Sequence, residues 1–445
     1  MARPGTLITL AACTAGLSLC ACGSKERRPA ADVPASLAAT DGLASGARDA
    51  GPPLASGCRP GKELAAVSPL GASSGSPSLA WGPGVVALSY VRDEGVRSLL
   101  AVERFVGGVQ HGPTVDVGEG AAREPTSVTW DGTSFVLAWG EPKDLVPEVF
   151  VGMVDAAGSV RWSASRLTET LQTGAWRTPG RTAVESKDPR VLALGNLLLL
   201  AWRTRTFPEA HPLYFAAVRG LEVSAPVAIT PETDFVLDHR LVDWSGRPAE
   251  AYIGRFSKTQ RQVRVARLSA EPPSVTDDWL VAELSKPPDS FEVAAVAIDA
   301  DLVLLWRTRT EWNSTSNVAY ARIGPDGPGG PLSDNIVVEG ALAANPPVNQ
   351  PRRSFAVAPL ERGFVLAWGF QDKPDAGGGT GLRVARYHAD GTLDGAPLAV
   401  STDERVARDP ALLRGADGEY WYAFVIGDPP GERGRVFFGS VLCGK

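Results

Sequence analysis

The stretch Phe135-Val136-Leu137-Ala138-Trp139 recurs almost unchanged as Phe364-Val365-Leu366-Ala367-Trp368. Each copy is an apolar run of strand length that ends in an aromatic residue. Further copies end at Trp202, Trp306, Tyr90, Tyr252 and Phe424, so the aromatic residue returns at intervals of roughly 50 to 60 residues. A repeat of this length, built from strand-like segments, indicates one supersecondary unit used several times.

The surroundings of each copy complete a unit of four strands. A short strand and a turn such as Asp131-Gly132 precede the aromatic run. An alternating strand such as 383–386 follows, then a turn such as Asp390-Gly391, then a short strand such as 396–400. Four antiparallel strands per repeat predict the blade of a β-propeller, with the aromatic run as the buried second strand.

We therefore predict an all-β fold, a β-propeller of seven four-stranded blades. Six or eight blades stay open as alternatives for two reasons. Tyr252 has a weak apolar lead-in, and the long stretch 167–187 fits either an inserted hairpin or a loop. The high content of turn residues, 48 Gly and 36 Pro, agrees with many short strands.

The two ends of the repeat region predict how the ring closes. The seventh unit, 405–443, has three strands, and the segment 63–69 resembles the missing fourth strand. An N-terminal strand that completes the last blade leaves no open sheet edge. This register brings Cys58 and Cys443 together, so we expect them to form a disulfide, although two free buried thiols are the alternative.

The N-terminus carries a targeting segment. Residues 6–19 are apolar or small, too short to span a bilayer, and lead into Leu19-Cys20-Ala21-Cys22. This ending resembles the lipobox of bacterial lipoproteins; a secretory signal with a chance cysteine is the alternative. The resemblance implies cleavage before Cys22 and lipid on Cys22, and two or more acyl chains anchor a protein stably.

The predicted organisation is a signal peptide over 1–21, a flexible tether over 22–57 and the propeller over 58–445. The tether is predicted from its Ala, Gly, Ser and Pro content, which offers too little apolar surface to fold. Gly23 after the cysteine implies the outer membrane, on its periplasmic or surface face. In architecture the chain resembles propeller lipoproteins and secreted propellers of bacterial envelopes.

Several functions are disfavoured. A net charge of −6 gives no basic field for nucleic acid. The usual hydrolase, metalloprotease and nucleotide motifs are absent, and four scattered histidines do not suggest a metal site. We expect no cofactor and no metal, and a non-enzymatic role is favoured over an enzymatic one. Surface or hairpin positions are expected for the four histidines, His111, His211, His239 and His388.

One rim of the ring carries the candidate ligand residues. Identical pentapeptides, 202–206 and 306–310, contain two arginines each beside a tryptophan. Such arginines could bind a carboxylate, phosphate or sugar, or they could pair with acids between blades. Triplets such as Lys187-Asp188-Pro189 and Arg408-Asp409-Pro410, at the start of blades, are expected to be structural. The predicted rim consists of Arg203, Arg205, Arg307, Arg309, Trp312, Trp176, Arg177 and His211.

The expected function is a lipid-anchored binding or scaffold module of the cell envelope, with an envelope protein or glycan as partner. The alternative is a glycan-active hydrolase or lyase with a site at the channel mouth. A purely structural partner of an envelope assembly complex is a further alternative.

Overall fold

The computed structural model describes residues 57–68, 73–74, 77–94, 97–119, 126–143, 146–168, 182–207, 210–220, 222–255, 260–284, 292–308, 316–328, 335–342, 354–371, 380–403, 407–416, 418–427 and 434–444. Cys22, the predicted signal peptide and all of the predicted tether except Gly57 lie outside these residues. Within the described ranges, no helix is both long and apolar enough to cross a membrane.

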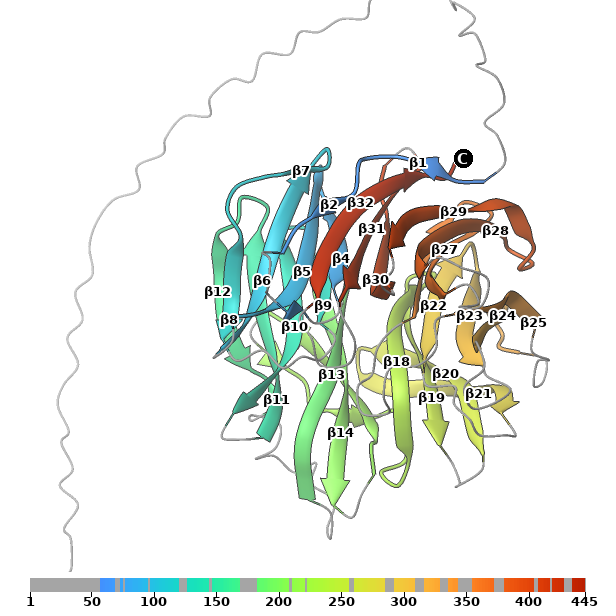
Figure 1. Cartoon of the computed structure of the whole chain (residues 1–445). Coiled ribbons are helices and arrows are strands. Elements are labelled where there is room, and N and C mark those ends of the chain that lie inside the picture. Colours follow the sequence, from blue (N-terminus) through green and yellow to red (C-terminus); the bar gives the residue numbers. More distant parts are fainter. Residues whose placement is uncertain are drawn as a thin grey trace, which may run out of the picture. The chain divides into compact units, whose positions relative to one another are not determined.

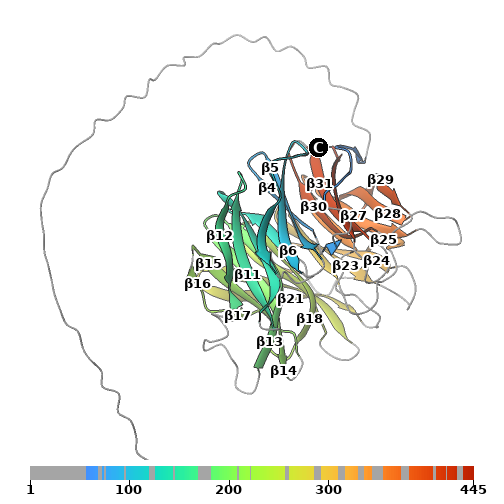
Figure 2. The same cartoon turned by 60° about the vertical axis from the view of Figure 1, so that its left-hand side comes forward.

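The described residues form seven antiparallel blades arranged as a ring, and the pair Leu342–Phe370 joins blades five and six into one sheet (Figure 1 and Figure 2). The innermost strands contact one another in cyclic order, and the last also contacts the first, which closes the ring. The prediction of an all-β, seven-bladed propeller is confirmed. The innermost strands are β4 (Ser78–Gly82), β9 (Ser127–Trp130), β13 (Thr182–Leu194), β18 (Phe235–Trp244), β22 (Val293–Ile298), β26 (Phe355–Leu360) and β30 (Ala407–Arg414).

The second strand of each blade carries the repeated aromatic run. It packs between neighbouring blades on both faces, and none of the seven aromatic side chains exposes more than 2 % of its surface. Burying such side chains is the main stabilising term of each blade. The second strands are β5 (Val85–Asp93), β10 (Ser134–Lys143), β14 (Leu197–Phe207), β19 (Arg247–Arg255), β23 (Asp301–Thr308), β27 (Gly363–Gln371) and β31 (Glu419–Ile426).

The third and fourth strands lie further out. The third strands are β6 (Ser98–Val106), β11 (Val146–Asp155), β15 (Leu213–Arg219), β20 (Arg261–Ala270), β24 (Ser316–Ile323), β28 (Thr380–His388) and β32 (Arg435–Leu442). The outer strands of blades one to six are β7 (Val109–Gln110) with β8 (Val115–Glu119), β12 (Val160–Arg166), β16 (Glu222–Val223) with β17 (Val227–Ala228), β21 (Pro273–Leu284), β25 (Asn335–Leu342) and β29 (Leu393–Asp403). A short strand, β3 (Ser73–Ser74), pairs with the end of β5.

The N-terminal strands complete the seventh blade, as predicted. β1 (Arg59–Pro60) and β2 (Ala65–Ala66) both pair with β32, and the N–H of Val67 donates to the carbonyl of Val436 at 2.9 Å. The predicted disulfide between Cys58 and Cys443 is confirmed, with an S–S distance of 2.14 Å and a Cα–Cα distance of 4.1 Å. Figure 1 shows β1 beside the C-terminal end.

Hydrogen bonds between innermost strands join successive blades. A side-chain oxygen near the start or middle of one innermost strand accepts a backbone N–H from the next blade. Such bonds occupy N–H groups that face the channel side of a ring, where a lost partner is costly. The acceptors are Ser78 Oγ for Val128 (3.2 Å), Ser127 Oγ for Val191 (3.1 Å), Asp238 Oδ2 for Val293 (3.0 Å) and Glu292 Oε1 for Ser354 (2.7 Å).

The base-acid-proline triplets form bulges in the innermost strands. Asp188 and Asp409 have φ angles of 52° and 51°, and the register of β13 and β30 shifts at these two residues. A bulge turns the aspartate out of the ladder, and the following proline needs no ladder donor. Residues from Thr182 belong to β13, so the end of the stretch 167–187 is part of the third blade.

The disulfide gives a stability prediction. Replacing both Cys58 and Cys443 by Ala should lower the free energy of unfolding by about 5 kcal/mol, because the bridge closes a loop of 385 residues that is otherwise free in the unfolded chain. Urea unfolding of the two proteins measures the difference. Reductant should destabilise the wild type to the same level and leave the double variant unchanged; equal stability of the oxidised wild type and the variant would contradict the prediction.

Candidate functional site between blades three and four

The predicted arginine rim is largely built into the blade junctions. Arg203 is buried, forms an ion pair with Asp188, and donates to the carbonyls of Val236 (2.9 Å) and Leu237 (2.8 Å) in the next blade. Arg307 is also buried, and its positive charge opposes the rise that burial causes in the pKa of Glu292. Both arginines lie in strands, because β14 and β23 continue past the tryptophans.

Two further members of the predicted rim are described, and they lie near the same junction. Arg205 pairs with Glu185 at 2.8 Å and exposes 45 % of its side chain. Lys187 pairs with the same carboxyl at 3.3 Å. His211 follows in the connection to β15. The other predicted rim residues, Trp176, Arg177, Arg309 and Trp312, lie outside the described residues.

His211 is not at the surface. Its ring stacks on Phe235 with centroids 3.9 Å apart, and neither ring nitrogen has a hydrogen-bond partner. Burial lowers the pKa of His211 to about 3, and the positive charges of Lys187, Arg203 and Arg205 add to this effect. Its backbone accepts from Val236 at 3.0 Å, which joins blades three and four.

His239 is also buried, which corrects the surface position expected from the sequence. Its Nδ1 lies 2.7 Å from Glu250 Oε1, and its Nε2 lies 2.7 Å from the carbonyl of Asp188. His211 and His239 are buried for the same physical reason, because each lies at the junction of blades three and four and contacts residues of the other blade. His111 and His388 are exposed, as expected.

The lowered pKa of His211 predicts a pH-dependent stability. Folding favours the neutral ring, so this stabilisation is complete above the unfolded pKa of about 6.5 and is lost as the pH falls from there toward 3. Between pH 7 and pH 5 the wild type should lose about 2 kcal/mol more than His211→Gln, measured by urea unfolding. The exposed control His388→Gln should follow the wild type. Parallel curves for wild type and His211→Gln would contradict the prediction.

An acidic cluster lies on the same side of blade four. Tyr252 donates to Asp278 at 2.9 Å, and Arg264 pairs with the same carboxyl at 2.8 Å. Burial raises the pKa of Asp234; the positive charge of Arg264 opposes this rise, and the negative charge of Asp278 adds to it. Oδ2 of Asp234 is buried without a hydrogen-bond partner. A raised pKa brings a carboxyl closer to the range in which general acids work.

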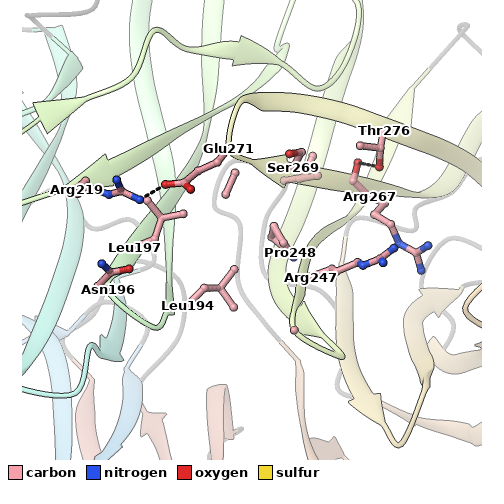
Figure 3. A pocket seen from close by; sticks show the side chains of 13 residues that line it. Leu194, Asn196, Leu197, Arg219, Arg247, Pro248, Arg267, Ser269, Glu271 and Thr276 are labelled. Atoms are coloured by element: carbon pink, nitrogen blue, oxygen red, sulfur yellow. Dashed lines mark hydrogen bonds and ion pairs between the residues drawn. The ribbon is translucent and has the colours of Figure 1, made fainter.

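The opposite rim of the same two blades carries an open pocket (Figure 3). We call it the main pocket. It encloses about 500 Å³, within the roughly 300 to 1,000 Å³ of small-molecule sites. Turns and strand ends of blades three and four line it, with residues Leu194, Asn196, Leu197, Arg219, Gly246, Arg247, Pro248, Arg267, Leu268, Ser269, Ala270, Glu271 and Thr276.

Arg267 is held in the main pocket by aromatic rings. Its guanidinium carbon lies 4.4 Å from the ring centroid of Trp244 and 5.0 Å from that of Trp279. Its Nε is buried, and no acid in the described part of the chain pairs with its guanidinium. Stacking thus fixes the position of this charge, and the terminal guanidinium nitrogens are the donors that a ligand could reach.

Arg247 supplies a second cation without an acidic partner among the described residues. It is exposed and follows a tight turn in which Ser245 has a φ of 54°. That turn is fixed to blade five, because Trp244 Nε1 donates to the carbonyl of Ala300 at 2.8 Å and Ser245 Oγ to that of Asp299 at 2.9 Å. Figure 3 shows Arg247 and Arg267 on the side of the pocket opposite Arg219 and Glu271.

A smaller side pocket of about 360 Å³ adjoins the main pocket. The two share Leu197, Arg219, Ala270 and Glu271. Arg219 of blade three forms an ion pair with Glu271 of blade four, and each exposes more than half of its side chain. This ion pair therefore stands between the two halves of one groove, which we call the blade 3–4 groove.

Sequence reasoning missed the groove. Its residues come from turns of two blades, and nothing in the local sequence marks Arg247 or Arg267 as different from other surface arginines. The positions of Trp244 and Trp279 in the sequence would indicate a fixed Arg267 only if both indole rings were already known to face its guanidinium. Gly327 packs on Trp279 so closely that a Cβ would lie 2.6 Å from the indole, and this holds the ring in place.

Among the described residues, no group of three or more His, Cys, Asp and Glu side chains is arranged to hold a metal ion. The groove presents donors on one side and aliphatic side chains on its floor, an arrangement suited to a ligand that is anionic at one end.

Comparisons with known proteins find the fold and no family. No protein-family model matches the chain, and no curated protein matches it. Among solved structures, the polysaccharide lyase Uly1 matches with a TM-score of 0.50 and 10% identity over 83% of this chain and 90% of that chain.

Two other solved structures match with lower scores. A protein of unknown function from Dyadobacter fermentans DSM 18053 has a TM-score of 0.49 and 11% identity, covering 86% of this chain and 99% of that one. The β-propeller domain of the Trilobed protease from Pyrococcus furiosus has a TM-score of 0.45 and 9% identity, covering 84% and 94%. At such identities the likeness concerns the fold alone.

Proposed function

We propose that the chain is a lipid-anchored binding module of the bacterial cell envelope, and that the blade 3–4 groove takes an anionic group of a protein or glycan partner. One observation carries the choice of site. Arg247 and Arg267 line one cavity, and neither pairs with an acid of the described chain. A cation that is fixed in place and has unused donors gains most from an incoming carboxylate.

The buried arginines of the predicted rim support the same choice. Arg203 and Arg307 lie inside the ring, where removing either would weaken a junction between blades. Among the described arginines of that rim, Arg205 has an exposed side chain. The predicted rim is therefore a second candidate location for a ligand.

The binding proposal predicts a preference for a carboxylate. We expect 4-phenylbutyrate to bind at least tenfold more tightly than 4-phenylbutanol, because hydrogen bonds to a charged group contribute about 1.5 to 3 kcal/mol. Ligand-detected NMR titration measures both affinities. Arg247→Ala and Arg267→Ala should each remove the preference, whereas the exposed control Arg161→Ala, outside the groove, should keep it.

Two results would count against this site. Equal affinity for the acid and the alcohol would refute anion recognition. Loss of binding in Arg205→Ala, with normal binding in Arg247→Ala, would move the site to the predicted rim.

A glycan-active enzyme is the second candidate function, and Asp234 is the observation that favours it. Burial raises the pKa of Asp234, its buried Oδ2 has no hydrogen-bond partner, and a second carboxyl, Asp278, is bound by Tyr252 and Arg264 on the same rim. Release of new reducing ends from an envelope polysaccharide by the wild type, and not by Asp234→Asn, would establish this function instead.

The membrane anchor predicts the cellular location. Cys22→Ser should release the protein from membranes, because the proposed lipid chains supply the attachment. Metabolic labelling of cells with a fatty acid, followed by fractionation, measures both the lipid on the protein and its membrane association. Cys20→Ser is the matched control and should stay membrane-bound and labelled. Membrane association of Cys22→Ser with retained label would refute the anchor.

A further inference from the structure

We infer that the occupant of the blade 3–4 groove is the C-terminal end of a peptide chain, whose α-carboxylate binds Arg247 and Arg267 and whose last side chains are aliphatic. This inference rests on the proposed binding function and names its partner class. It commits to a protein partner; a glycan becomes an outcome of the test.

The cationic side of the groove fits one carboxylate. The terminal guanidinium nitrogens of Arg267 have no acceptor among the described residues, and the stacking on Trp244 and Trp279 holds this guanidinium in place. Arg247 stands on a turn that blade five fixes, so its backbone is already in place and only its exposed side chain is ordered on binding. Two positioned guanidinium groups can share one carboxylate, which accepts at both oxygens.

The floor of the groove favours aliphatic side chains over sugar rings. Leu194, Leu197, Leu268 and Pro248 line the main pocket, and Val223 with Pro272 lines the side pocket. The aromatic rings near the groove, Trp244 and Trp279, stack on Arg267, and neither is among the lining residues. An aliphatic floor buries a Leu or Val side chain, worth about 1.5 to 3 kcal/mol when complete.

The acids of the side pocket exclude a chain of repeated anions. Glu222 and Glu271 both line it as exposed carboxyls, and Arg219, which pairs with Glu271, lines it too, so the side pocket keeps an excess of one negative charge. A uronic acid polymer held at Arg247 and Arg267 would place its next carboxylates toward these acids, where like charges repel. A peptide has one terminal carboxylate and uncharged peptide groups behind it, which suits a groove that has two cations at Arg247 and Arg267 and an excess of one negative charge in the side pocket.

The test compares peptides that differ only at the end. An acetylated hexapeptide ending in Val-Leu with a free carboxylate should bind the full chain at least tenfold more tightly than its amide, measured by isothermal titration calorimetry. Arg247→Ala should lower the affinity for the free acid about tenfold and leave that for the amide unchanged. Arg161→Ala should change neither affinity.

A second pair of variants tests whether the carboxyl of Glu271 repels an acidic side chain of the peptide. Replacing the penultimate Val of the peptide by Glu should weaken binding several-fold, and Glu271→Gln should recover part of that loss. A structural role of Glu271 alone would affect both peptides equally.

The outcomes separate the inference from the proposal on which it rests. Equal affinity for acid and amide peptides overturns the inference. If 4-phenylbutyrate binds through Arg247 and neither peptide binds, the anion site stands and the peptide is excluded. If trigalacturonate binds more tightly than the peptide acid, the partner is a glycan and the inference is wrong. If none of these ligands binds, the inference and the proposed function both fail.

Discussion

Side-chain oxygens that accept backbone N–H groups across the innermost strands hold the ring together. Ser78, Ser127, Asp238 and Glu292 each serve the next blade in this way. A blade cannot bury its apolar faces alone, so every blade depends on its neighbours staying in register. These bonds fix that register near the axis, while the buried aromatic strands supply the apolar contact further out. A loss at one junction therefore affects two blades.

The same demand explains why arginines repeat in the sequence. Arg203 and Arg307 follow equivalent tryptophans because each balances an acid at an equivalent junction, Asp188 for the first and Glu292 for the second. Arg267 contrasts with both, since two indole rings hold it and no described acid neutralises it. These arginines differ in the partner of the guanidinium group, which the sequence does not record.

Much of the fold could be predicted because it repeats. The run ending at Trp139 and its copies fix the second strand of each blade, and from that register the closing strand and the Cys58–Cys443 pair follow. The groove could not be predicted in this way. It arises where turns of two blades meet, and those turns vary from copy to copy. Buried His211 and His239 were missed for a related reason: their partners come from other blades or from another strand of their own.

The disulfide has a mechanical consequence for a tethered protein. A pull on the chain ahead of Cys58 would, without the bridge, load the short strands β1 and β2 first and peel them from β32. With the bridge, the load passes from Cys58 directly to Cys443 at the end of β32, which pairs along its whole length with β31. The weakest strands of the ring then carry no tension. A partner that drags on the propeller would strain a long paired strand rather than open the ring at its seam.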